Sequence, residues 1–241
     1  NRIRIVTLGN STTTPHFAEC WPKQLFQLLK AEGLNVEIYN GGVSGYTSAQ
    51  ELLKLVRDVL PIKPDIVISY SGVRDIGFFH SIPGHPFINK FLSRTLSSLP
   101  VSSFKTKTGK DTISGINYGT RSNTTPHENW CANIRMMNAI CKEFKIKLYS
   151  ILQPTLGVGN YTRSCSEKDM LQKFDLSFHN EYIPELNSFY NATRKFAEKT
   201  DFITDLVDVF AGHSDIYHDC RHPNGEGYKI IAKHIRSVIK L

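Results

Sequence analysis

Residues 2–15 read Arg-Ile-Arg-Ile-Val-Thr-Leu-Gly-Asn-Ser-Thr-Thr-Thr-Pro. The run from Ile3 to Leu8 is rich in apolar and β-branched residues, which is typical of a buried strand. It stops at Gly9, and Ser11 follows at once. Open parallel sheets bind their ligands at the carboxyl ends of the strands. The stretch therefore predicts a strand that presents a serine at such an edge, and the alternative is a plain loop of small polar residues.

The composition is that of a globular protein, with 40% hydrophobic and 21% charged residues among 241. This length can bury a substantial core, and we expect one domain over residues 1–241. There is no run of about 18 apolar residues, so we expect no membrane span. The formal net charge is +7, but the lysines and arginines are scattered. We therefore expect a solvated surface and no nucleic-acid partner.

The chain has five cysteines at unpatterned spacings, and no Cys-x-x-Cys motif. Free thiols and the absence of a visible signal peptide favour a cytoplasmic location. Asn1 leads straight into the first strand, so we expect the natural protein to extend upstream. The sequence does not predict the oligomeric state.

Strands and helices alternate along the chain, which predicts a parallel α/β sheet. We expect strands at 2–8, 35–39, 65–70 and 147–152, and a short one within 202–209. We expect helices at 21–32, from Thr47 or Ser48 to about 60, from Thr125 to Phe144, at 180–199 and at 225–240. Two segments break the rhythm: an insertion at about 76–125, placed over the active-site face, and an irregular excursion from Gln153 to about Asp175.

Acyl transfer by a nucleophile needs a hydroxyl, a base, an acid that orients the base, and donors for the oxyanion. Each has a candidate at the end of a predicted strand or in a loop: Ser11, Gly45, the tetrapeptide 72–75, and the segment from Asp219 to His222. Because successive parallel strands end at one edge of the sheet, these four segments can converge.

The stretches LGNSTT, NGGVSGYTS, SGVRD and DCRHPNGEGY occur in this order over nearly the whole chain. In this order they resemble the SGNH (GDSL-type) hydrolases. The resemblance implies a three-layer α/β/α flavodoxin-like fold with a five-stranded parallel sheet and an insertion after the third strand.

Carried over residue by residue, the resemblance implies a catalytic triad. Ser11 becomes the nucleophile, His222 the general base and then acid, and Asp219 the residue that orients His222. The backbone N–H groups of Ser11 and Gly45 become oxyanion donors. The expected activity is that of an ester hydrolase working through an acyl-enzyme, without metal or cofactor. The habits of the family favour an O-acetyl group on a carbohydrate or glycoconjugate as substrate.

Two positions depart from the family pattern. Asn10 stands where the family usually has Asp, and we expect this to be tolerated because Asn keeps the shape and an acceptor. Arg74 stands where the family has the Asn that donates to the oxyanion. Arg74 can donate to the oxyanion in place of that Asn, or bind a carboxylate or phosphate on the substrate. It can also turn out of the site and leave an oxyanion hole with two donors, or simply pair with Asp75. Asn10 and Tyr46 are further candidates for substrate contact.

Three other functions stay open. An O-acyltransferase would use the same triad and pass the acyl group to a sugar hydroxyl. A non-catalytic binding domain would keep the fold, an idea that Asn10 and Arg74 motivate. A flavodoxin-like nucleotide-binding protein would need a phosphate loop after the first strand, and Pro15 lacks the backbone donor that such a loop uses. Phe78, Phe79, His80 and Phe87 of the insertion could form an apolar wall for the acyl group, or core that anchors the insertion.

Overall fold

The computed structural model describes residues 2–15, 19–76 and 125–241. Their strands form one parallel sheet in the order β2-β1-β3-β4-β5. The strands are β1 Ile3–Gly9, β2 Val36–Asn40, β3 Ile66–Ser71, β4 Lys147–Leu152 and β5 Ile203–Asp205. This confirms the predicted α/β fold with a five-stranded parallel sheet.

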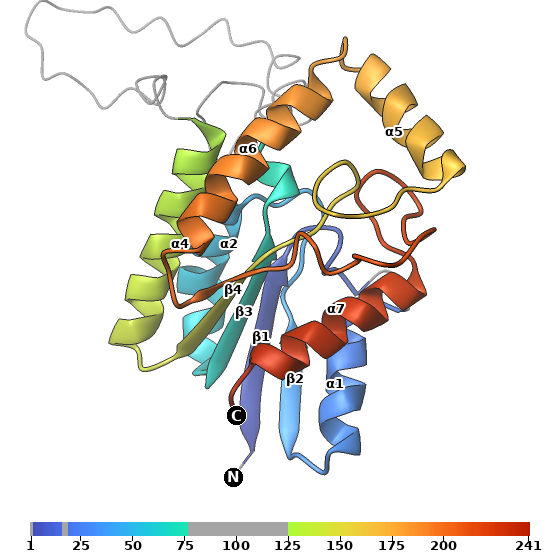
Figure 1. The fold of residues 1–241 in the computed structure, drawn as a ribbon. Helices are drawn as coiled ribbons and strands as arrows, with labels where there is room; N and C mark the ends of the chain where they lie inside the picture. The colour runs from blue at the N-terminus through green and yellow to red at the C-terminus, as the bar shows by residue number, and fades with distance from the viewer. Residues whose placement is uncertain (1, 16–18, 77–124) are drawn as a thin grey trace, which may run out of the picture.

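Helices cover both faces of the sheet. The α-helices of the described residues are α1 Trp21–Ala31, α2 Ser48–Lys54, α4 Pro126–Glu143, α5 Cys165–Leu176, α6 Tyr182–Ala197 and α7 Gly225–Val238. Helices α1 and α7 lie on one face, and α2, α4 and α6 lie on the other (Figure 1). The molecule therefore has the three layers that were expected.

Helix starts follow the capping chemistry of the sequence. The backbone N–H of Thr125 donates to the Glu128 carboxylate (2.7 Å), and the Thr125 hydroxyl accepts from the Glu128 N–H (3.4 Å). Thr47 caps α2 in the same way with Gln50. These boxes satisfy backbone donors that a first helical turn leaves open. Beyond α2 the chain continues as a short π-helix, Leu55–Val59, and a 3₁₀ helix, Leu60–Ile62.

The prediction of an irregular segment from Gln153 to Asp175 was wrong in its second half. Helix α5 begins there at Cys165, after Ser164, which forms a capping box with Glu167. This helix buries only Glu167 and Leu171, so it lacks the apolar repeat that marks a helix packed on a core. The capping motif was the available signal. The predicted insertion, with its proposed aromatic wall, lies almost wholly outside the described residues.

The register of the sheet places the candidate loops at one edge. Gly9 pairs with Tyr70, and Ser71 pairs with Leu152, so β1, β3 and β4 end side by side.

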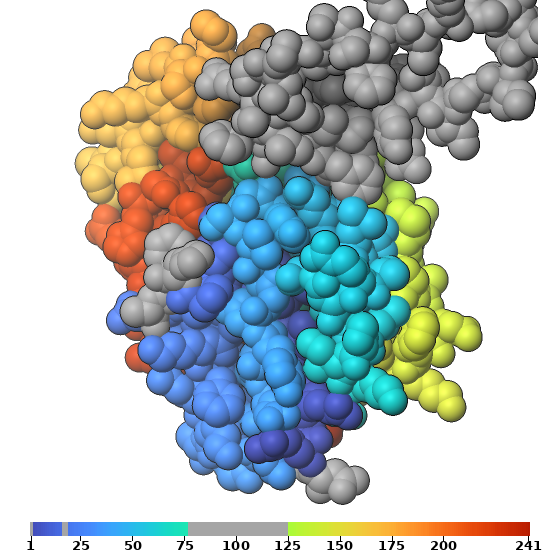
Figure 2. Space-filling view, turned by 180° about the vertical axis from the view of Figure 1, so that it is seen from behind, coloured from blue at the N-terminus to red at the C-terminus, as the bar shows by residue number. Residues whose placement is uncertain are grey.

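In the view from behind, α1, β2 and α2 lie next to one another (Figure 2). Among the described residues, no helix is long and apolar enough to cross a membrane.

Candidate active site

The turn after β1 is built around Gly9 and Asn10. Gly9 has φ +156°, and a Cβ there would lie 2.2 Å from the Thr13 hydroxyl and 2.8 Å from the carbonyl oxygen of Tyr70. Only glycine lets the turn fold back this closely on β3. The Asn10 side-chain oxygen accepts from the Thr12 N–H (3.0 Å) and the Thr12 hydroxyl (2.8 Å). These hydrogen bonds stabilise the turn that carries Ser11.

Ser11, His222 and Asp219 form a continuous hydrogen-bonded relay. The Ser11 Oγ lies 2.7 Å from His222 Nε2, and His222 Nδ1 lies 2.7 Å from Asp219 Oδ2. The other Asp219 oxygen accepts from the backbone N–H groups of Arg221 (2.8 Å) and His222 (2.9 Å). The three residues come from two loops separated by more than 200 positions. The structure thus brings together the triad that the motifs predicted.

Asp219 is held in its charged form. Partial burial would raise its pKa, but the hydrogen bond from His222 and those from two backbone N–H groups lower the pKa to about 2. A carboxylate only accepts, so the proton between these residues sits on His222 Nδ1. The lone pair of Nε2 then faces the Ser11 hydroxyl, which is the arrangement of a general base beside its nucleophile.

The N–H groups of Ser11 and Gly45 were the predicted oxyanion donors, and the two turns that carry them are joined by the bond from the Val43 N–H to the Gly9 carbonyl (3.0 Å). Gly45 has φ +82°, a left-handed conformation that favours glycine, in the turn between β2 and α2. Within the described part of the chain, no backbone hydrogen bond of the turns and loops uses the N–H of Ser11 or of Gly45. Amides at such turns can serve as oxyanion donors.

Arg74 lies directly after β3 and is partly buried, on the short 3₁₀ turn Val73–Asp75. Burial and then the charge of Arg221 lower its pKa to about 10, so its guanidinium stays charged at neutral pH. The neighbouring Asp75 accepts hydrogen bonds from Ser48, through its N–H (3.0 Å) and its hydroxyl (2.5 Å). Asp75 thus anchors the start of α2. Burial raises its pKa to about 7, against the lowering effect of Ser48 and then Arg74.

Asn10 is 1% exposed, and its Nδ2 donates to the side-chain oxygen of Gln153 (2.7 Å). These contacts favour a supporting role over direct contact with substrate. Tyr46 is partly buried, and its phenol lies within electrostatic reach of Arg57.

Two residues of this site were not predicted. Gln153 follows β4, and a polar side chain at the carboxyl end of a parallel strand was the available signal. Arg221 lies inside the Asp-x-x-His motif itself. Their partners, Asn10 for Gln153 and Phe174 for Arg221, lie far away in the sequence, so no local pattern shows these contacts.

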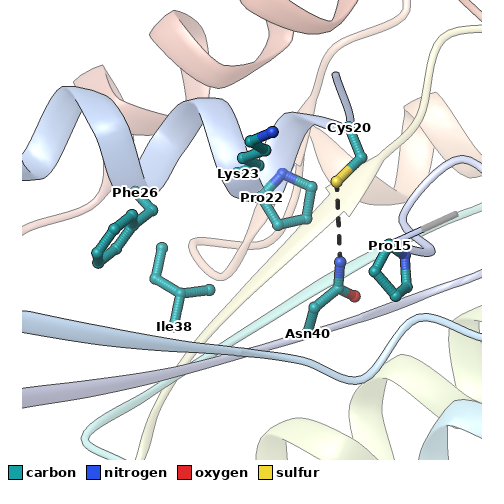
Figure 3. Close-up of a pocket in the computed structure, with 7 residues that line it drawn as sticks. All are labelled: Pro15, Cys20, Pro22, Lys23, Phe26, Ile38 and Asn40. Carbon is teal, nitrogen blue, oxygen red and sulfur yellow. Dashed lines mark hydrogen bonds between the residues drawn. The ribbon is translucent and has the colours of Figure 1, made fainter. Parts of the chain in front are cut away.

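An apolar pocket lies between α1 and β2 (Figure 3). Its volume is about 310 Å³, and its lining comprises Pro15, Cys20, Pro22, Lys23, Phe26, Ile38 and Asn40. The Asn40 amide donates to the Thr13 carbonyl (2.7 Å), which connects the pocket to the turn that carries Ser11.

Within the described residues, no group of three or more His, Cys, Asp or Glu side chains could hold a metal ion.

Comparison with solved structures finds the same fold repeatedly. One match is the acetyl xylan esterase AlAXEase, with 17% identity, a TM-score of 0.61, and coverage of 99% of this chain and 100% of the other. A variant of Axe2, an acetylxylan esterase from Geobacillus stearothermophilus, has 17% identity and a TM-score of 0.58, with 98% and 93% covered. A GDSL-like lipase from Bacteroides thetaiotaomicron has 17% identity and a TM-score of 0.52, with 97% and 86% covered. At these identities the likeness shows the fold alone.

Comparison with curated proteins finds no match. The model of one protein family, GDSL-like Lipase/Acylhydrolase, matches residues 5–235. The match includes all four candidate segments, from the turn after β1 to the start of α7. The chain belongs to the GDSL-like lipase/acylhydrolase family, also known as the SGNH hydrolases, which cleave ester bonds.

Proposed function

We propose that this protein is an O-acyl esterase that removes a small acyl group, such as acetyl, from a carbohydrate or glycoconjugate through an acyl-enzyme on Ser11. The observation that carries the proposal is the relay from Ser11 through His222 to Asp219, with both links at 2.7 Å. The fold likeness to esterases of acetylated xylan supports acetylated glycans as the first substrates to test.

The proposed reaction has two halves. His222 Nε2 takes the Ser11 proton as Oγ attacks the ester carbonyl, and the N–H groups of Ser11 and Gly45 stabilise the oxyanion. The C–O bond to the alcohol breaks, and the alcohol leaves with the proton from His222. Water then attacks the acyl-serine with His222 again as base, which releases the acid and restores Ser11.

The test is release of acetate from 4-nitrophenyl acetate and from an O-acetylated glycan. Ser11→Ala should lower kcat by about four to six orders of magnitude, because the nucleophile is lost. Ser237→Ala removes an exposed hydroxyl on α7 and serves as the matched control, which should match the wild type. A fluorophosphonate probe should label the wild type and not Ser11→Ala.

The other outcomes identify the alternatives. An acyl-enzyme that persists in water and is discharged by an added sugar would identify an acyltransferase. No turnover and no labelling of Ser11 would overturn the proposal in favour of a binding domain.

A further inference from the structure

One side chain joins the two turns whose backbone N–H groups are the proposed oxyanion donors. Asn40 is the last residue of β2 and lines the pocket of Figure 3. We propose that Asn40 is a positioning residue that sets the spacing between the N–H groups of Ser11 and Gly45. The inference rests on the proposed function and deepens it, because it names a residue that shapes the oxyanion site through the two turns.

The Asn40 amide forms a hydrogen bond to each turn. Its Nδ2 donates to the carbonyl oxygen of Thr13 (2.7 Å), two residues after Ser11. Its Oδ1 accepts from the N–H of Gly42 (2.9 Å), three residues before Gly45. A carbonyl oxygen needs a donor and an N–H needs an acceptor, so the two partners allow only one orientation of the amide. The side chain therefore connects the two turns in a defined geometry.

The two turns also lie directly against each other. The N–H of Val43 donates to the carbonyl of Gly9 (3.0 Å). A Cβ at Gly42 would lie 2.7 Å from the carbonyl carbon of Thr13 and 2.9 Å from the Thr13 Cβ. There is thus no room for a side chain between the Gly42 backbone and the turn that carries Ser11. At such close contact, a shift of one turn moves the other.

The other end of the Gly45 turn is held separately. There the N–H and the hydroxyl of Ser48 donate to Asp75, which follows β3. The segment that carries Gly45 is therefore fixed at α2 by Asp75 and at β2 by the bonds to the Ser11 turn. An oxyanion site is sensitive to this placement, because its donors must lie about 2.7–3.1 Å from the oxyanion.

The experiment compares Asn40→Ala with Asn40→Asp in the turnover of 4-nitrophenyl acetate. The alanine removes both bonds. An ionised Asp keeps the size and the acceptor for Gly42, but it has no donor for the carbonyl of Thr13. Each variant should lower kcat by about ten- to a hundredfold and leave KM within about twofold, because a misplaced donor weakens binding of the transition state and not of the substrate. A kcat of the wild type in both variants would overturn the inference.

Two control variants on the same strand separate positioning from folding. Val36→Ala removes a buried side chain at the opposite end of β2, and Tyr39→Phe removes an exposed hydroxyl that donates to Glu37. Both should keep kcat and KM within about twofold. Fluorophosphonate labelling of Asn40→Ala should reach the same end point as in the wild type, but more slowly. A lower end point reached at the wild-type rate would identify loss of folded protein and overturn the positioning role.

Hydrogen exchange tests the link between the turns without any turnover. Exchange at the Val43 N–H should be faster in Asn40→Ala than in the wild type. Exchange at the Ile3 N–H, which donates to the Asn35 carbonyl at the other end of β2, should be unchanged.

The combined results keep the two proposals apart. An active wild type with unchanged exchange and kcat in Asn40→Ala overturns the inference and leaves the esterase. A wild type that turns over no ester and takes no label overturns the esterase. Faster exchange at Val43 would then support the link between the turns without that activity, and unchanged exchange would overturn both proposals.

Discussion

At the scale of single residues, Asn10 shows how a departure from the family pattern is accommodated. Its amide donates to Gln153 Oε1 and accepts from Thr12, whereas an ionised carboxylate at this position could only accept. The Gln153 Nε2 atom is buried and has no hydrogen-bond partner among the described residues. Rotation of the Gln153 amide by 180° would therefore present a donor to an Asp at position 10.

The first prediction concerns this amide pair. Gln153→Leu leaves the buried Asn10 Nδ2 without its acceptor and should lower the free energy of unfolding by about 1–3 kcal/mol. Asn10→Asp should cost less, because Gln153 can turn to donate. Urea denaturation of the two variants measures both effects. A Gln153→Leu protein as stable as the wild type would show that the pair does not hold the Ser11 turn.

A second residue-scale prediction concerns Asp219. Asp219→Asn should lower kcat by about a thousand- to ten-thousandfold, because the amide no longer selects the His222 tautomer with a free Nε2. The pKa of Asp219 is about 2, so its charge is lost only as the pH falls through that value. The profile of kcat/KM against pH should accordingly show no limb from Asp219 above about pH 4. Such a limb, present in the wild type and absent in Asp219→Asn, would contradict this assignment.

At the scale of elements, α2 carries a buried acid against the sheet. Glu51 is fully buried, and one of its oxygens accepts from the Ser69 hydroxyl on β3 (2.6 Å). Burial raises the pKa of Glu51 well above its usual value, against a smaller lowering effect of Ser69 and a further rise from Asp75. Glu51 therefore stays protonated in the folded chain at pH values where it ionises in the unfolded chain.

The sign of the pH dependence follows from this shift. Below about pH 4.5 the Glu51 carboxyl is neutral in both the folded and the unfolded chain. Above this pH the carboxyl loses its proton in the unfolded chain, which lowers the free energy of the unfolded state relative to the folded one. The contribution of Glu51 to stability should fall as the pH rises from about 4.5 toward the raised pKa. Glu51→Gln keeps the acceptor for Ser69 and should flatten the curve of unfolding free energy between pH 5 and 7. An unchanged slope would show that Glu51 is already ionised in the folded protein.

At the scale of the whole molecule, the loop with Asp219 and His222 depends on segments far from it in sequence. Glu167 on α5 accepts from the Tyr161 hydroxyl (2.6 Å) and from the Tyr217 N–H (3.0 Å). The Tyr161 hydroxyl in turn accepts from the Ile216 N–H (2.9 Å). Helix α5 thus positions the start of this loop, which lies across the carboxyl edge of the sheet.

The prediction at this scale compares two changes in the same capping box. Glu167→Ala removes the bonds to the loop and the carboxylate half of the box, which accepts from the Ser164 N–H. Ser164→Ala removes only the hydroxyl half, which accepts from the Glu167 N–H. Ser164→Ala should cost about 1 kcal/mol of stability and leave kcat nearly unchanged. Glu167→Ala should cost more stability and lower kcat by about tenfold or more, since the loop that carries the proposed base loses its support. Thermal unfolding and ester turnover of both variants provide the comparison, and equal kcat values would contradict the coupling.

The sequence by itself determined the alternation of strands and helices, the cap at Thr125, a cap at Thr47 or Ser48, and the order of the four motif segments. These features depend on neighbours a few residues apart, through side-chain periodicity and local hydrogen bonds, so they are readable along the chain. The two links from Ser11 to His222 and from His222 to Asp219 were expected from the motifs and are present in the structure.

Only the tertiary structure decided which partners meet at the carboxyl edge of the sheet. Asn10 contacts Gln153 because β1 and β4 lie on either side of β3 and end at the same edge of the sheet. Helix α5 was missed because it buries too few apolar side chains to show a period, and it is held by Glu167 instead. Contacts of this kind are set by strand order and register, which join residues 50 to 211 positions apart and leave no mark in any local window of the sequence.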